Sequence, residues 1–302
     1  MRHGLLRPSR VPPREDRELK ELVRYRASII EERAREYNRI DKVLQGANIK
    51  LSSVTSSMDT KSGMAMVGAI VEGEFNSDVL ASMAKGTMKG KEEALKRALK
   101  GFIQPHQQLM LKAMLSHISS LNEQIVVLDE EIDKRLYDKR HIIEVLDEIP
   151  GVGKQSAQVL ITEIGTDMAD FPSDKHLASW AGVCPGNNES AGKKKRGKTR
   201  KGNPTLKKTL VRCARSASRT KGSYLQAMYG RIAARRGSNI ACMAVARTIL
   251  EIYYHMVKDG TCYMDLGADY YDERNREFIA RKSIKRLEGL GYKVSVEEEK
   301  AC

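Results

Sequence analysis

The chain has 302 residues, a net charge of +14 at pH 7 and a pI near 9.5. This length is enough for one large domain or two ordinary ones, and the excess of basic residues favours a polyanionic partner, nucleic acid first. The positive charge is concentrated in one segment. Residues 190–250 contain 17 lysines and arginines and no aspartate or glutamate, so the rest of the chain has a net charge of −3.

Several classes of protein are excluded by composition. The five cysteines form no CxxC motif and no Cys/His pair at metal-ligand spacing, which argues against a zinc site or a disulfide framework and fits a reducing cytosol. The first 17 residues lack the apolar core of a signal peptide, and we expect no apolar run of about 20 residues that could span a membrane. Only 5% of the residues are aromatic, which favours contacts to backbone phosphates over stacking of unpaired bases.

Apolar spacing predicts helices throughout the first 100 residues. The segment 15–44 has apolar residues at helical spacing among dense charges, as in an amphipathic helix that faces solvent. A Ser/Thr-rich link over residues 46–62 follows, and shorter helices are predicted at 63–72, 77–85 and 89–99.

A regular apolar repeat follows, in alternating steps of three and four residues. Its members are Leu111, Met114, Ile118, Leu121, Ile125, Leu128 and Ile132. A repeat of this kind is typical of a coiled coil, because its narrow apolar stripe needs a partner helix. The partner is either the helix over 15–44, in an intramolecular hairpin, or a second copy of the chain. The two arrangements are compatible if all the helices join one bundle.

A glycine-rich turn separates two predicted helices after His141. Residues 142–146 and 156–164 have helical spacing, and the turn between them reads IPGVGK. This is the arrangement of a helix-hairpin-helix, in which Gly151 and Gly153 let backbone N–H groups approach a phosphate and Lys154 adds charge at a helix N-terminus. The structural alternative is an ordinary turn between two helices.

One serine stands in a loop that is dense in lysine, arginine and glycine. Ser190 precedes Ala191, Gly192 and a cationic run that ends before Pro204. A positive potential stabilises an alkoxide and a phosphorane-like transition state, as attack of a hydroxyl on a phosphodiester requires. The residues of this run predicted to bind DNA are Lys193, Lys194, Arg196, Lys198, Arg200, Lys201 and Asn203. The alternative is a basic loop that binds phosphate without chemistry.

The sequence after this loop favours a folded segment, because the glycines at 192, 197 and 202 recur every five residues and a helix is predicted from Pro204. Its apolar face carries Leu206, Leu210 and Ala214, with basic residues around it. The six histidines are isolated and none is an obvious general base. The acid-free segment also has no carboxylate, so no metal ligand is predicted there.

Four stretches of the chain together resemble the prokaryotic insertion-sequence transposases of the IS-one-ten type. They read MRHGLLRPS, IPGVGKQSAQVLITEIG, FPSDKHLASWAGVCPGNNESAGKKKRGKTRKGN and LGADYYDERNREFIARKSIKRLEGLGYKV. The block from Asn187 to Asn203 is quite specific to that family, and the resemblance covers nearly the whole chain.

The resemblance implies an RNA-guided recombinase of the DEDD/serine kind. Its members have an N-terminal RuvC-like domain with four acidic Mg²⁺ ligands, a coiled-coil middle and a C-terminal transposase domain. By resemblance, Ser190 forms a covalent phosphoserine link to DNA, the active site is shared between protomers of a dimer or larger oligomer, and a structured RNA from the element guides recognition. The residues that match the family's motifs are Pro150, Gly151 and Gly153 at the hairpin turn and Gly192, Lys193, Gly202 and Asn203 around the serine.

One departure from the family concerns the metal. In the family, RHGLLRPS follows the RuvC-like domain, whereas here it starts at Arg2. None of the four metal-binding acids has a matching position. We therefore expect the chain to bind no cofactor itself, Mg²⁺ being implied only through the missing domain, and this leaves autonomous activity open.

The sequence thus predicts a mainly α fold, with a helical coiled-coil middle followed by a compact helical transposase domain that contains the helix-hairpin-helix. The predicted division is a linker and helix over 1–60, a coiled-coil region over 61–141, a transposase domain over 142–260 and a tail over 261–302. A solvated helix is predicted over 269–289 and a short strand near 292–296.

The predicted function is DNA strand exchange by a transposase located in the cytoplasm with the nucleoid. Its expected partners are DNA, a guide RNA and other copies of the chain, with no membrane. The alternative is a non-catalytic remnant that binds DNA or RNA, and a weaker one is a junction-binding protein unrelated to transposition.

Overall fold

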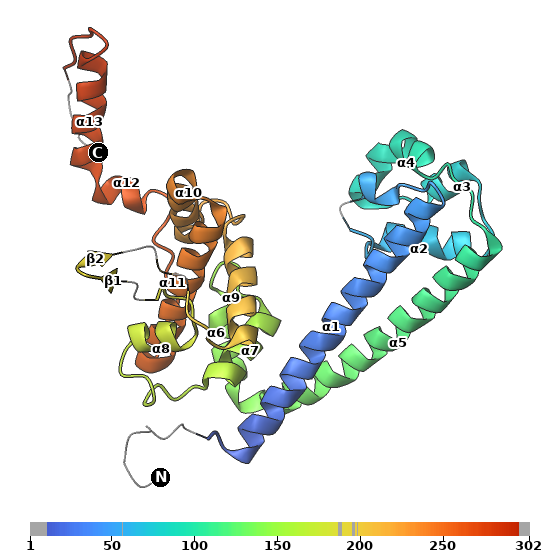
Figure 1. Cartoon of the computed structure of the whole chain (residues 1–302), viewed down its shortest axis with the longest axis horizontal. Coiled ribbons are helices and arrows are strands. Elements are labelled where there is room, and N and C mark those ends of the chain that lie inside the picture. Colours follow the sequence, from blue (N-terminus) through green and yellow to red (C-terminus); the bar gives the residue numbers. More distant parts are fainter. Residues whose placement is uncertain (1–10, 56, 187–188, 195–196, 198, 296–302) are drawn as a thin grey trace. The chain divides into compact units, whose positions relative to one another are not determined.

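The computed structural model describes residues 11–55, 57–186, 189–194, 197 and 199–295, without the side chains of Ser190 and Lys194. The chain divides into two compact units, Met1–Arg135 and Leu136–Cys302 (Figure 1). Both consist mainly of helices, as predicted. The observed boundary lies at 135/136 rather than 141/142, and the predicted segments 1–60 and 61–141 share the first unit because their long helices pack together.

The first unit is built on two long helices, α1 and α5. Its elements in order are α1 (Arg14–Gly46), the 3-10 turn η1 (Leu51–Ser53), α2 (Lys61–Val71), α3 (Ser77–Ser82), η2 (Gly86–Lys91), α4 (Glu92–Ala98) and α5 (Pro105–Arg135). These helices agree with the predicted ones to within a few residues, except that residues 86–91 form a 3-10 turn before α4.

Polar contacts show that α1 and α5 are antiparallel. The pairs join Glu18 to Arg135 at 3.4 Å, Arg26 to Asp129 at 2.7 Å, Arg33 to Asn122 at 2.7 Å and Glu36 to His117 at 3.1 Å. Residue numbers rise on one helix as they fall on the other. The guanidinium of Arg26 is almost completely buried, with 2% of its side chain exposed.

The apolar repeat lies in the seam between these helices. Its buried members are Leu111, Ile118, Leu121, Ile125 and Ile132, and they face buried residues of α1 such as Ile29 and Ile40. The intramolecular hairpin is therefore present in the structure. Pairing with a second copy of the chain stays a prediction.

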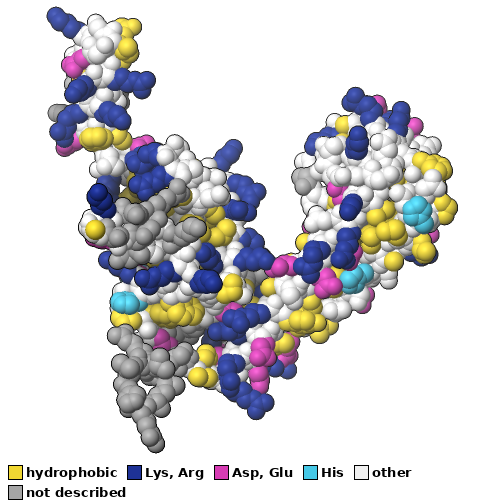
Figure 2. Space-filling model, in the orientation of Figure 1, with side chains coloured by type: hydrophobic (Ala, Val, Ile, Leu, Met, Phe, Trp, Pro, Cys, Tyr) yellow, Lys and Arg dark blue, Asp and Glu magenta, His cyan; other side chains and the backbone are white. Residues whose placement is uncertain are grey.

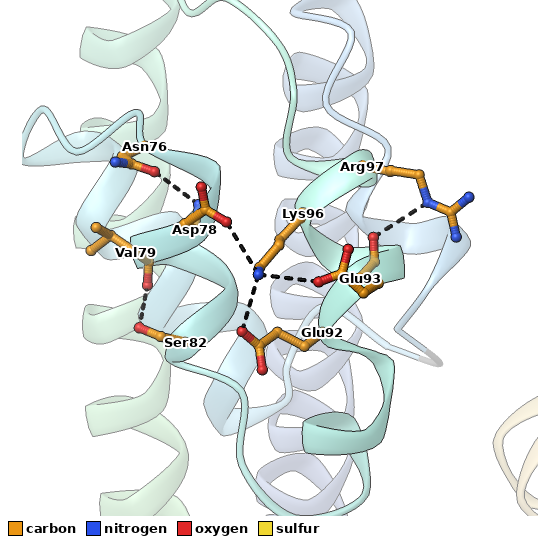
Figure 3. Close-up of polar contacts among 8 residues, drawn as sticks. All are labelled: Asn76, Asp78, Val79, Ser82, Glu92, Glu93, Lys96 and Arg97. Atoms are coloured by element: carbon orange, nitrogen blue, oxygen red, sulfur yellow. Dashed lines mark hydrogen bonds and ion pairs between the residues drawn. The ribbon is translucent and has the colours of Figure 1, made fainter.

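The short helices α2, α3 and α4 close one end of this unit. Lys96 of α4 links this helix to α3, because its ammonium lies 3.2 Å from Asp78 of α3; it also lies 3.4 Å from Glu92 and 3.1 Å from Glu93 of its own helix (Figure 3). The carboxylates raise the pKa of this lysine, so it stays charged at any physiological pH.

The second unit is arranged around one long helix, α11. Its elements are η3 (Tyr137–Lys139), α6 (Arg140–Asp147), α7 (Lys154–Ile164), α8 (Asp174–Trp180), the strands β1 (Glu189–Ser190) and β2 (Lys193–Lys194), α9 (Pro204–Ala217), α10 (Tyr224–Arg236), α11 (Ser238–Asp259), α12 (Tyr270–Arg274) and α13 (Arg276–Glu288). Helices α8, α9 and α10 all pack against α11 (Figure 1).

Helix α11 corrects the expectation about long apolar runs. It is long and apolar enough to cross a membrane by length and composition, but half of its most apolar window is buried within the protein. Tyr253 and Tyr254 are buried and donate hydrogen bonds to the carbonyls of Gly165 at 2.7 Å and Phe171 at 3.0 Å. We therefore interpret α11 as the core helix of this unit.

The C-terminal part also differs from the expectation. The predicted helix over 269–289 is broken at Asn275 into α12 and α13, and none of the residues of α13 is buried. The predicted strand is wrong for residues 292–295, which form no strand, and Val296 lies outside the described residues.

Candidate nucleic-acid interface

The serine lies in a folded β-hairpin. Strands β1 and β2 are antiparallel, with Ser190 opposite Lys193 and Glu189 opposite Lys194. The turn between them consists of Ala191 at φ +49° and Gly192 at φ +73°. A two-residue turn of type I′, the shortest connection between two antiparallel strands, requires positive φ at both of its residues. Ser190 therefore immediately precedes a tight turn in a folded segment, as the recurrence of glycine favoured.

Backbone contacts between glycines hold the two arms of this hairpin together below the strands. A Cβ added to Gly197 would lie 2.1 Å from the carbonyl oxygen of Gly186, and one added to Gly202 would lie 2.5 Å from the carbonyl carbon of Ala181. Between them, Pro185 pairs with Thr199. The regular recurrence of glycine at 197 and 202 thus follows from close approach of backbone to backbone.

The base of the hairpin is fixed by Asn203. Its side-chain oxygen accepts a hydrogen bond from the backbone N–H of Leu206 at 3.1 Å and so caps α9. Its amide nitrogen donates to the carboxylate of Glu163 on α7 at 2.6 Å. Glu163 is buried, with 3% exposed. Both ends of the Asn203 amide are thus engaged within the protein, and sequence reasoning missed Glu163, whose only signal was a charged residue in an apolar helix.

The turn of the predicted helix-hairpin-helix packs against α9. Gly151 has φ +85°, and a Cβ there would lie 2.4 Å from the carbonyl oxygen of Cys213 and 2.6 Å from the backbone nitrogen of Ala217. This packing gives Gly151 a structural reason to be glycine. Gly153 and Lys154 are exposed at the start of α7 and remain the part of the turn that a phosphate can reach.

Helix α9 has the predicted division into faces. Leu206, Leu210 and Ala214 are buried, while Lys208, Arg212 and Arg215 are exposed on the outer side. Of the other predicted DNA-binding residues, Lys193, Arg200 and Lys201 are exposed, Lys194 is described by its backbone alone, and Arg196 and Lys198 lie outside the described residues. Figure 2 shows lysine and arginine side chains spread over the visible face of this unit.

Three thiols and two phenols of this unit have a raised pKa. Burial raises the pKa of the thiols of Cys184, Cys213 and Cys242, and burial likewise raises the pKa of the phenols of Tyr224 and Tyr253. A raised pKa keeps these groups protonated at neutral pH, which lowers their reactivity toward phosphorus.

Histidines and acidic residues are the candidates for a general base and for metal ligands. His117 and His255 lie beside carboxylates on helices, and His176 contacts Ser173 at the start of α8. Among the residues that the structure describes, no group of three or more histidines, cysteines or acids could hold a metal ion. These residues therefore do not fit the Mg²⁺ site of the family, and no step of the proposed chemistry depends on a metal.

Comparison with known proteins places these elements in a family. Residues 143–230, which contain the turn, the hairpin and α9, match the "Transposase IS116/IS110/IS902 family", and residues 1–49 match a second family described as "Transposase" and named for the DEDD transposases of IS110. These two segments are thus similar to domains of the IS110-type transposases.

Two curated relatives agree with this assignment. The chain is 31% identical over 164 residues to "Insertion element IS110 uncharacterized 43.6 kDa protein" of Streptomyces coelicolor, which covers 51% of the chain and 38% of the relative. It is 27% identical over 167 residues to "Transposase for insertion sequence element IS1328" of Yersinia enterocolitica, which covers 53% and 48%. The matched regions span less than half of the relatives' lengths.

Proposed function

We propose that the chain is an insertion-sequence transposase that joins DNA strands through Ser190. The observation that carries the proposal is the hairpin itself: a serine beside a tight turn and opposite Lys193, at the start of the acid-free segment 190–250. Glu189, which precedes the serine, lies opposite Lys194. A local positive potential stabilises the alkoxide of the serine and the charge that develops on the attacked phosphorus.

The step is a transesterification. The hydroxyl oxygen of Ser190 bonds to the phosphorus of a phosphodiester, the P–O bond to the departing sugar breaks, and the proton of the serine leaves with that sugar oxygen. The product is a phosphoserine link between protein and DNA. Lys193, Arg200 and Lys201 hold the neighbouring phosphates, with Gly153 and Lys154 as a further contact. We place the protein in the cytoplasm with the nucleoid, and its partners as DNA, a guide RNA and further copies of the chain.

A covalent adduct tests the nucleophile. The chain is incubated with a fluorescent duplex that carries the element's end, and protein–DNA bands that survive detergent are counted. We expect an adduct with the wild type and with the control Ser216→Ala, an exposed serine of α9, but none with Ser190→Ala. An adduct that persists in Ser190→Ala overturns the assignment, and no adduct with any variant favours the binding-only alternative.

The cations of the hairpin are expected to set the salt dependence of DNA binding. Replacing Lys193–Arg196 by alanine should reduce the slope of log Kd against log salt by about 0.9 for each phosphate that the protein no longer neutralises. The measurement is fluorescence anisotropy over about 50 to 200 mM salt, a range in which such phosphate contacts change affinity strongly. A control removes four exposed lysines of the other unit, Lys85, Lys89, Lys91 and Lys100. If the two variants have equal salt slopes, the hairpin is not part of the DNA interface.

A further inference from the structure

A second basic site lies where α9, α10 and α11 meet. It is a pocket of about 280 Å³ at the end of α9 away from the serine hairpin, because α9 starts at the base of the hairpin and runs toward Ala217. The pocket is lined by residues that include Arg215, Ser218, Arg219, Tyr229, Ser238 and Asn239. None of them belongs to the predicted site.

The charge of this pocket is uncompensated. Arg215 and Arg219 are exposed, and neither forms an ion pair with a carboxylate in the described part of the chain. By contrast, Arg231 of α10 pairs with Asp272 at 3.1 Å, and Arg247 of α11 pairs with Glu251 at 2.6 Å. Two guanidinium groups one helical turn apart repel each other, and a bound anion removes that repulsion.

Hydrogen-bond donors in the pocket are also available. The side chains of Tyr229, Ser238 and Asn239 have no hydrogen-bond partner among the described residues, whereas Ser218 donates to the carbonyl of Arg215 at 2.8 Å. Gly237 precedes α11 at φ +86°, where a residue with a capping side chain would be strained, and no side chain caps this helix. The first N–H groups of α11 thus add to the donors that the side chains supply.

We propose that this pocket, the α9–α11 pocket, binds a backbone phosphate of a nucleic acid. Two arginines match the anionic oxygens of a phosphodiester and can bind them in bidentate fashion, and the hydroxyl and amide donors match its remaining lone pairs. The proposal rests on the proposed function only in expecting nucleic acid as the partner. It does not depend on Ser190 as a nucleophile.

The outer face of α9 connects the pocket to the hairpin. Lys208, Arg212 and Arg215 recur in steps of four and three residues, which places them along one side of α9, and Arg219 follows in the turn after the helix ends at Ala217. From Lys208 to Arg215 they span about 10 Å at 1.5 Å per residue, a length that covers about three phosphates of one strand. A strand held in the pocket can therefore follow this row of cations toward Ser190.

Binding measurements with the full chain test the pocket. The variant Arg215→Ala/Arg219→Ala is compared with the wild type by fluorescence anisotropy, once with duplex DNA and once with a hairpin RNA that has the same number of phosphates. We expect about a fivefold loss of affinity near 0.15 M salt and a salt slope lower by about 1, as the removal of one phosphate-binding site gives. A loss with only one of the two probes identifies which nucleic acid occupies the pocket.

A matched control removes two exposed lysines elsewhere, in Lys282→Ala/Lys285→Ala on α13. A larger loss of affinity in the pocket variant than in the control variant supports the proposal. Equal losses of affinity in the two variants, or no loss in the pocket variant with either probe, overturn it. Thermal unfolding of both variants should match the wild type, because the four side chains lie at the surface. Adduct formation by Ser190 is scored separately, so failure of the nucleophile and failure of the pocket give different results.

Discussion

Replacing Gly151 with alanine is expected to lower the free energy of unfolding by about 2–5 kcal/mol. The substitution forces alanine into φ +85° and places its Cβ 2.4 Å from the carbonyl oxygen of Cys213 in α9. Positive φ costs a residue with a side chain about 1–2 kcal/mol, and the backbone clash adds about 1–3 kcal/mol, as overpacking does. Chemical denaturation followed by far-UV circular dichroism measures the loss.

The neighbouring glycine provides the control. Gly153 has an ordinary φ of −88°, and the nearest atom to an added Cβ is 4.0 Å away. Gly153→Ala should therefore leave stability within about 0.5 kcal/mol of the wild type. If it lowers DNA affinity instead, Gly153 belongs to the phosphate-binding surface. Equal stability of Gly151→Ala and the wild type would mean that the turn does not pack on α9 as described.

This pair of glycines shows what sequence could and could not predict. The motif IPGVGK correctly predicted a turn between two helices, because proline and glycine act within a few residues of themselves. It did not distinguish the roles of Gly151 and Gly153. That distinction depends on Cys213 and Ala217, more than 60 residues further along the chain, and a single sequence carries no signal for such a contact.

The same limit applies to the serine hairpin. The recurrence of glycine correctly favoured a folded segment, but it did not predict that Gly197 would face Gly186 or that Gly202 would face Ala181. The register of a hairpin depends on its turn, and the turn at Ala191 needs positive φ at a residue that rarely adopts it. Strands of two residues are also too short to show an alternating pattern.

The long helices were predicted well, because their apolar periodicity extends over many turns. The partner helix of α5 could not be predicted, because an apolar stripe can pack against any helix with a similar stripe. In the structure, pairs such as Arg26 with Asp129 and Arg33 with Asn122 accompany the intramolecular pairing. These complementary groups lie about 90–100 residues apart in sequence, so their match becomes visible only once the two helices are aligned antiparallel.

Changing Asn203 to aspartate is expected to destabilise the second unit by about 2–4 kcal/mol at pH 8. Aspartate still caps α9, but it replaces the donor that now lies 2.6 Å from Glu163 with a second carboxylate beside a buried one. Losing a hydrogen bond to a buried charged group costs about 1.5–3 kcal/mol, and the second negative charge beside Glu163 adds to this, while the capping bond to α9 survives. The measurement is the free energy of unfolding by denaturant at several pH values.

The loss should depend on pH in a defined direction. Two adjacent carboxylates raise the pKa of the pair in the folded state, so the folded chain holds a proton that the unfolded chain has released. A raised folded pKa favours folding at low pH, and this advantage is lost as the pH rises from about 4, the ordinary pKa of these acids. The loss of stability in Asn203→Asp is therefore smallest near pH 4 and grows toward pH 8.

Asn203→Ser, which keeps a capping oxygen without adding a charge, is the control. If the two variants differ by the same amount at pH 5 and pH 8, the contact between Asn203 and Glu163 does not hold the hairpin to α7.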